Sequence, residues 1–212
     1  MENATEEAVA RHRAIVLLGP TGSGKTPLGE TMQRRGLWGR QCLHFDFGAN
    51  LREIVRRNCP SRQVTREDIE FLREVLESGA LLENEHFPVA GRILQSFLAA
   101  AGAEQRTCIV LNGLPRHVGQ ARAIETLLHV DAVIDLQCSG ETVLARIRSD
   151  IGGDRVGRID DDLDAIRTKL AIFRQRTAPL LEHYRGQAAR IETLEVTDAM
   201  TPQQAWQALN AR

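Results

Sequence analysis

The eight residues from Gly19 to Thr26, GPTGSGKT, constrain the fold of this chain more than any other feature. They match the phosphate-loop pattern G-x-x-x-x-G-K-[ST] at every specified position. An apolar, strand-like run over residues 14–18 precedes them, and a helical pattern over residues 24–35 follows. Strand, glycine-rich loop and helix in this order bring backbone N–H groups and a helix N-terminus to one point. We therefore expect an α/β core that binds nucleotide phosphates.

The motif also predicts individual contacts within the loop. Lys25 should reach the β- and γ-phosphates, and the Thr26 hydroxyl is placed to bind Mg²⁺, the one cofactor that we expect. The residues expected to contact the nucleoside triphosphate here are Gly22, Ser23, Gly24, Lys25, Thr26 and Pro27.

Composition limits the partners. The chain has 212 residues, 27 basic and 28 acidic side chains and a net charge of −1, which argues against general binding to nucleic acid or to an anionic membrane. No apolar run has transmembrane length, and the polar, acidic residues 1–10 do not resemble a secretory signal. Neither the four cysteines nor the six histidines have metal-ligand spacing, so we assign none of them to a metal. We expect a cytoplasmic monomer.

Alternating patterns along the chain indicate one α/β domain over residues 1–212. Strand-like runs at residues 14–18, 41–45, 107–111, 131–136 and 190–196 predict a five-stranded parallel sheet flanked by helices. Helical patterns cover residues 24–35, 117–127, 140–149 and 160–184, and a last helix begins near Thr201-Pro202. The predicted parts are a core of about 12–47, 103–149 and 159–212, a helical insertion of about 48–102, and a short lid of about 150–158.

A second motif, Asn112-Gly113-Leu114-Pro115-Arg116, follows the third predicted strand, and Gln120 lies four residues beyond Arg116. The motif resembles the Asp-Gly-Phe-Pro-Arg of adenylate kinases and, more broadly, of nucleoside monophosphate (NMP) kinases. The resemblance covers nearly the whole chain. Weaker matches follow in the expected order at residues 48–52, 78–82, 158–161 and 177–180.

The resemblance implies the P-loop NTPase fold with a helical NMP-binding insertion, and phosphoryl transfer from ATP to a nucleoside monophosphate, most simply AMP. Two other functions stay open on the residues alone: a small-metabolite kinase on the same core, and a regulatory module that binds nucleotide with little turnover. Arg52, the 112–116 motif and Gln120 favour a nucleotide acceptor.

The resemblance also assigns roles to residues. Catalysis is implied for Lys25, Arg116, Arg146, Arg158, Arg167 and Lys169. Arg146 and Met200 join the loop residues in binding ATP. Binding of the monophosphate is implied for Phe47, Arg52, Ala80, Leu81, Leu82, Gly113, Arg116, Gln120 and Arg158.

Arg167 and Lys169 are two residues apart on a predicted helix and cannot face the same way. Motif spacing puts Lys169 at the family's catalytic arginine position. Arg167 is then either the outward side chain or a substitute after a slight shift.

Four residues depart from the family pattern. Asn112 replaces the aspartate expected to help hold hydrated Mg²⁺, so we expect Thr26 to hold the ion, with Asn112 acting through water. On this reasoning, Asn112→Asp should strengthen the site. Asp150 stands near a lid arginine position, with Arg148 or Arg155 as possible replacements, while Ala49 replaces an aspartate and Phe47 a threonine at the monophosphate site.

Overall fold

The computed structural model describes residues 11–80, 82–154 and 163–211. Its centre is a five-stranded sheet in the order β2-β3-β1-β4-β5, and every neighbouring pair is parallel. The strands are β1 (His12–Leu18), β2 (Cys42–Asp46), β3 (Cys108–Asn112), β4 (Leu128–Gln137) and β5 (Arg190–Glu195). The predicted sheet is confirmed. β4 begins at Leu128, three residues before the predicted start at residue 131. Leu128 pairs with His12 of β1, so this pairing extends both strands beyond the apolar runs from which they were predicted.

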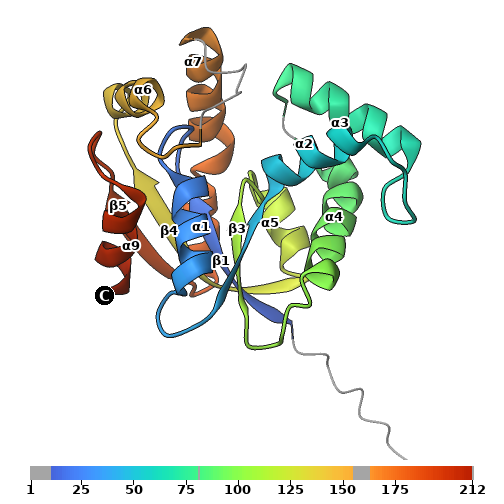
Figure 1. Cartoon of the computed structure of the whole chain (residues 1–212), viewed down its shortest axis with the longest axis horizontal. Coiled ribbons are helices and arrows are strands. Elements are labelled where there is room, and N and C mark those ends of the chain that lie inside the picture. Colours follow the sequence, from blue (N-terminus) through green and yellow to red (C-terminus); the bar gives the residue numbers. More distant parts are fainter. Residues whose placement is uncertain (1–10, 81, 155–162, 212) are drawn as a thin grey trace, which may run out of the picture.

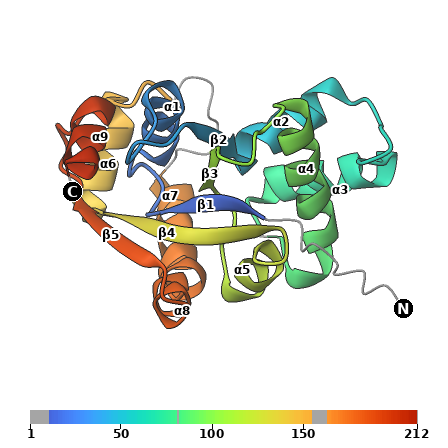
Figure 2. The ribbon, with the colours of Figure 1, turned by 90° about the horizontal axis from the view of Figure 1, so that it is seen from below.

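Helices cover both faces of the sheet, as the near-continuous apolar strands require. Figure 2 shows α1 (Lys25–Arg35) and α9 (Pro202–Asn210) on one face, and α5 (Val118–Ile124) and α8 (Leu180–Gly186) on the other. Successive residues of β1 serve opposite sides: Ile15 packs in the cluster of Leu28 and Leu209, and Val16 in that of Ile124 and Leu180. This two-sided core fixes the strand ends that carry the site.

The predicted insertion between β2 and β3 is helical. It contains α2 (Phe47–Arg57), α3 (Arg66–Ser78), a 3₁₀ turn η1 (Asn84–His86) and α4 (Phe87–Ala100). Figure 1 shows α2 and α3 on one side of the upper end of the molecule, with α6 (Gly140–Ser149) and α7 (Leu163–Ile172) on the other. Ile93 and Leu94 of α4 pack in the same hydrophobic core as residues of the sheet. Helix α4 therefore anchors the insertion to the main domain.

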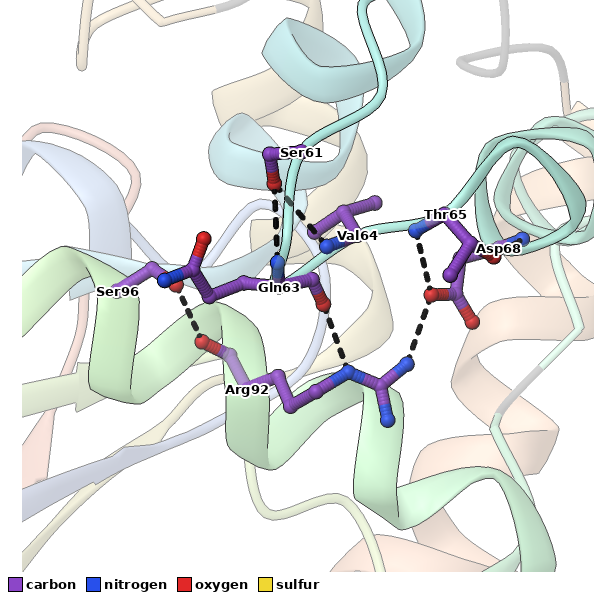
Figure 3. Close-up of polar contacts among 7 residues, drawn as sticks. All are labelled: Ser61, Gln63, Val64, Thr65, Asp68, Arg92 and Ser96. Carbon is purple, nitrogen blue, oxygen red and sulfur yellow. Dashed lines mark hydrogen bonds and ion pairs between the residues drawn. The ribbon is translucent and has the colours of Figure 1, made fainter.

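One arginine holds the connection between α2 and α3 against α4 (Figure 3). Arg92 donates to the Gln63 carbonyl and to Asp68 Oδ2, both at 2.7 Å. Asp68 also accepts from the Thr65 N–H, while the Thr65 hydroxyl accepts from the Asp68 N–H, which forms a capping box at the start of α3. The position of α3 therefore depends on a residue 24 positions further along the chain.

The described part of the predicted helical region 160–184 is helical, but it is not a single regular α-helix. α7 runs into a π-helical turn, η2 (Phe173–Thr177), and α8 follows. The Ala178 N–H bonds to the Phe173 carbonyl, five residues back, at 2.9 Å, and Pro179 has no N–H to continue the α-helical ladder. The predicted helix at 117–127 is also shorter, ending at Ile124.

The C-terminal helix begins as predicted. Thr201 caps α9 in a capping box with Gln204, and Pro202 occupies the first turn. The Trp206 indole donates to the Gly36 carbonyl at 2.7 Å and Trp38 to the Leu209 carbonyl at 2.9 Å, which joins α9 to the α1–β2 connection. Residues 1–10 lie outside the described ranges. Among the described helices, none is both long and apolar enough to cross a membrane.

Candidate active site

A cavity of about 240 Å³ opens at the carboxyl ends of β1, β2 and β3. The phosphate loop forms one wall, and the start of α2 with the end of α3 forms another. Of the residues predicted from the sequence, the lining includes Gly22, Gly24, Lys25, Thr26, Phe47, Arg52, Ala80, Leu82, Asn112, Gly113, Arg116, Gln120 and Lys169. Residues from five separate chain segments thus meet in one cleft.

The phosphate loop has the conformation that its glycines allow. Gly19 and Gly24 have φ of 145° and 92°, and Gly24 is the N-cap of α1, so the helix begins one residue later than predicted. A Cβ at Gly19 would lie 2.8 Å from the Leu136 carbonyl oxygen, which excludes any side chain there. Lys25 Nζ donates to the carbonyls of Gly19 and Pro20, both at 2.7 Å. The ammonium group thus lies across the loop.

Three polar side chains meet behind the loop, at the ends of β2 and β3. Thr26 Oγ1 donates to Asp46 Oδ2 at 2.7 Å. Asn112 Nδ2 lies 2.8 Å from Asp46 Oδ2 and 3.0 Å from Thr26 Oγ1. Sequence reasoning missed Asp46, although it directly follows an apolar strand, in the way that Asn112 does.

Arg116 enters the cleft from a loop that is held on both sides. Its N–H donates to Gln120 Oε1 at 2.8 Å, and its carbonyl accepts from Thr177 Oγ1 at 2.9 Å. Burial lowers the pKa of the Arg116 guanidinium from its usual value, because a charge in the cleft loses hydration. An anion in the cleft would restore a partner to this cation.

Gln120 differs from its predicted setting. The resemblance implies that Gln120 binds the monophosphate, but the residue is only 1% exposed. Its Nε2 donates to the Leu82 carbonyl at 2.8 Å, and His117 Nε2 lies 3.0 Å from the same oxygen. Gln120 therefore joins the loop after β3 to the segment that follows α3. Its buried position depends on this contact with Leu82, which has no local signal in the sequence.

Arg146 lies outside the cleft lining, behind the phosphate loop. It is 5% exposed, and its guanidinium donates to the carbonyls of Gly22 at 3.1 Å, Thr197 at 2.7 Å and Met200 at 2.8 Å. In the same region, a small cavity is lined by Ser23 together with Arg146 and Met200. Pro27 is buried on α1 and would be 3.0 Å from a Cβ at Gly152.

The alternatives for Arg167 and Lys169 are separated by their positions. Lys169 lines the cleft. The Arg167 side chain is 76% exposed and pairs with Asp164 at 3.1 Å, on the outer side of α7. The expectation that both belong to the site is therefore corrected for Arg167.

The other departures from the family pattern have structural consequences. Phe47 is buried at the start of α2 and lines the cleft, and the Ala49 N–H donates to Asp46 Oδ1 at 2.8 Å. Asp150 ends α6 with a left-handed φ of 46°, and Arg148 is exposed. The predicted Leu81, Arg155 and Arg158, and the lid beyond residue 154, lie outside the described residues.

The residues around Thr26 fit a magnesium ion. Mg²⁺ takes oxygen ligands and is usually held by one or two protein oxygens together with substrate phosphates. A hydroxyl and a carboxylate oxygen 2.7 Å apart at the end of the phosphate loop provide such a set. Among the described residues, no group of three or more His, Cys, Asp or Glu side chains could hold a metal alone.

A parallel sheet with a phosphate loop after its central strand, facing a cleft lined by lysine and arginine, defines a P-loop nucleotide-binding protein of the α/β class. Residues 17–189 match the family model described as adenylate kinase, and the chain belongs to the adenylate kinase family. This membership confirms the resemblance inferred from the motifs and identifies a nucleoside monophosphate kinase.

Comparison with individual relatives also supports membership of the adenylate kinase family. The chain is 31% identical to an adenylate kinase of Corynebacterium glutamicum, over 84% of this chain and 89% of the relative. It is 32% identical to one of Xanthomonas campestris, with the same two coverages. Identity to one of Mycobacterium bovis is 29%, over 87% of this chain and 92% of the relative.

Proposed function

We propose that the protein transfers the γ-phosphoryl group of ATP to AMP and forms two ADP. The observation that carries this proposal is the single cleft in which the phosphate loop faces Arg52 and Arg116. An oxygen of the AMP phosphate attacks the γ-phosphorus, the bond to the β–γ bridging oxygen breaks, and ADP leaves with that electron pair.

The donor site is the phosphate loop. Gly22, Ser23 and Gly24 give their backbone to the triphosphate, and Lys25 exchanges the carbonyls of Gly19 and Pro20 for phosphate oxygens. Arg146 holds Thr197 and Met200 beside the loop, which supports a role in shaping the ATP site rather than in contacting the transferred group. Pro27, in the first turn of α1 and close to Gly152, is the remaining residue that we propose to border ATP.

The acceptor site is the wall opposite the loop. Arg52 and Arg116 bind the monophosphate, because a guanidinium group can make paired hydrogen bonds to phosphate oxygens. Phe47 supplies an apolar surface for the base, and Ala80 and Leu82 border it, with Gly113 beneath. Gln120 acts by holding the Leu82 carbonyl in place.

Lys169 takes the role of the cation nearest the transferred group, and Arg116 lines the same cleft. The roles assigned to Arg158 and Leu81 rest on the motif alone. When bound, Mg²⁺ would supply positive charge that offsets the negative charge of the donor phosphates. Thr26 is a residue that would hold it. A monomer in the cytoplasm, without nucleic-acid or membrane partners, is the setting that we propose from the sequence.

Calorimetry with a bisubstrate analogue tests this function. Two adenosines joined by five phosphates would occupy both sites at once, so we expect the analogue to bind far more tightly than ATP. Equal affinities would remove the two-site proposal. A panel of AMP, CMP, UMP, GMP, dAMP and shikimate-like metabolites with Mg²⁺–ATP then measures acceptor preference, and ADP formation fastest with AMP is the expected result. Phosphorylation of a non-nucleotide metabolite instead would contradict the proposal.

A further inference from the structure

We propose that Asp46 supplies the carboxylate of the magnesium site and that Asn112 positions this carboxylate. The inference rests on the proposed function, since it concerns the ion that accompanies ATP. It gives a role to a residue that the motifs do not single out, and it explains how an asparagine is tolerated at the end of β3.

The register of the sheet puts the two side chains together. Asp46 and Asn112 are paired residues at the carboxyl ends of β2 and β3. Leu17 of β1 pairs with Asn112 as well, which brings the start of the phosphate loop to the same level. A side chain at position 46 and one at position 112 can therefore both reach the Thr26 hydroxyl. A carboxylate at position 46 can therefore occupy the same site as a carboxylate at position 112.

The Asp46 carboxylate is held in a fixed orientation. Oδ1 accepts from the Ala49 N–H at 2.8 Å, because Asp46 is the N-cap of α2. Oδ2 is thereby turned toward Thr26 Oγ1, at 2.7 Å. This is the hydroxyl that the phosphate-loop motif assigns to the metal.

The residue type at position 112 suits this carboxylate. Asn112 donates through Nδ2 to Asp46 Oδ2 at 2.8 Å, and the amide is buried, with 4% exposed. An ionised aspartate there would have no proton to donate and would place a second negative charge beside the first. The amide at 112 and the carboxylate at 46 thus form a complementary pair.

Charge in the described cleft lining supports the assignment. Its acidic side chains are Asp46 and Asp154, and of these Asp46 bonds to Thr26. The basic side chains, Lys25, Arg52, Arg116 and Lys169, have their own use in binding phosphate. Asp46 is therefore the described carboxylate placed for a divalent cation at Thr26.

Metal titration with exchanged residues tests the inference. Mn²⁺ is titrated into the complex of the protein with the β,γ-imido analogue of ATP, and electron paramagnetic resonance measures its binding. The affinity of the protein for the analogue alone is measured separately in EDTA. Asp46→Asn keeps a side chain that caps helices well, so α2 should remain folded. We expect it to weaken Mn²⁺ binding by about ten- to a hundredfold without weakening the analogue in EDTA. Asp154→Asn, which removes the other cleft carboxylate, is the matched control and should leave Mn²⁺ affinity near that of wild type.

The double exchange Asp46→Asn/Asn112→Asp is the decisive variant. It restores one carboxylate and one amide in swapped places, and we expect it to recover most of the lost Mn²⁺ affinity. Unchanged Mn²⁺ affinity in Asp46→Asn, or no recovery in the exchange, would overturn the inference. If wild type transfers phosphate while Asp46→Asn binds Mn²⁺ normally, the inference fails and the proposed function stands. If wild type does not bind the ATP analogue, both fail.

Discussion

At the scale of single residues, Lys25 is the cation at the centre of the donor site. Its ammonium bonds to two loop carbonyls, and the residue lines the cleft. We expect Lys25→Ala to keep the fold and to lower the rate of ADP formation by about 10³-fold or more, since cations on a transferring phosphoryl group have effects on that scale. The measurement is the initial rate beside a thermal melt. Wild-type turnover with an unchanged melt would contradict the assignment.

Asn112 gives the second prediction at this scale, which concerns the stability of the metal-free protein. Asn112→Asp would put a carboxylate oxygen about where Asn112 Nδ2 now lies, 2.8 Å from Asp46 Oδ2. In the metal-free protein this should raise the pKa of one carboxyl group above its unfolded value. The resulting loss of stability, of about 1–3 kcal/mol, is complete above the raised pKa and disappears as the pH falls below the unfolded value.

Chemical denaturation at pH 7.5 and at pH 4, in EDTA, measures this difference between Asn112→Asp and wild type. The two pH values lie on either side of a raised carboxyl pKa, and pH 4 is close to the ordinary aspartate value of about 3.9, where most of the deficit should be lost. We expect the deficit to be larger at pH 7.5. A variant as stable as wild type at both pH values would show that position 112 does not face Asp46.

At the scale of elements, the insertion depends on the contact between α4 and the α2–α3 connection (Figure 3). Arg92→Ala removes the bonds to the Gln63 carbonyl and to Asp68. Because the pair is partly exposed, we expect only about 1 kcal/mol of global destabilisation. Amide hydrogen exchange over residues 61–68 should accelerate more than exchange in β1. Arg66→Ala, an exposed site in the first turn of α3, is the control, and equal effects of the two changes would refute this role of Arg92.

The elements also show what sequence can predict and what it cannot. The phosphate loop and the five strands depend on local patterns, so both were predicted. The contact of Asp46 with Asn112 depends on strand register, and that of Gln120 with Leu82 joins residues 38 positions apart, so neither has a local signal. Arg167 and Lys169 were separated only when the helix orientation was known. The π-helical turn before Pro179 was not predicted: the proline indicates a missing backbone N–H, but the helical periodicity continues across it.

At the scale of the whole molecule, the two walls of the cleft should act as one binding unit. A ligand that binds only the folded state stabilises it by about 2.7 kcal/mol at a free concentration 100 times its Kd. For a chain of this size, the bisubstrate analogue at that concentration should raise Tm by roughly 5–10 °C. Scanning calorimetry checks the shift, and Lys25→Ala should reduce it at the same ligand concentration. A shift no larger than that produced by an equal concentration of AMP would argue against joint occupation of the walls.

Arg146 joins chain segments that are far apart in sequence, since its guanidinium bonds to carbonyls 124, 51 and 54 positions away. In polymer terms, these bonds close long loops before any nucleotide arrives. The entropy lost in bringing the segments together belongs to folding and not to binding. The donor nucleotide therefore meets a site whose back wall is already assembled, and its binding free energy need not offset the closure of those loops.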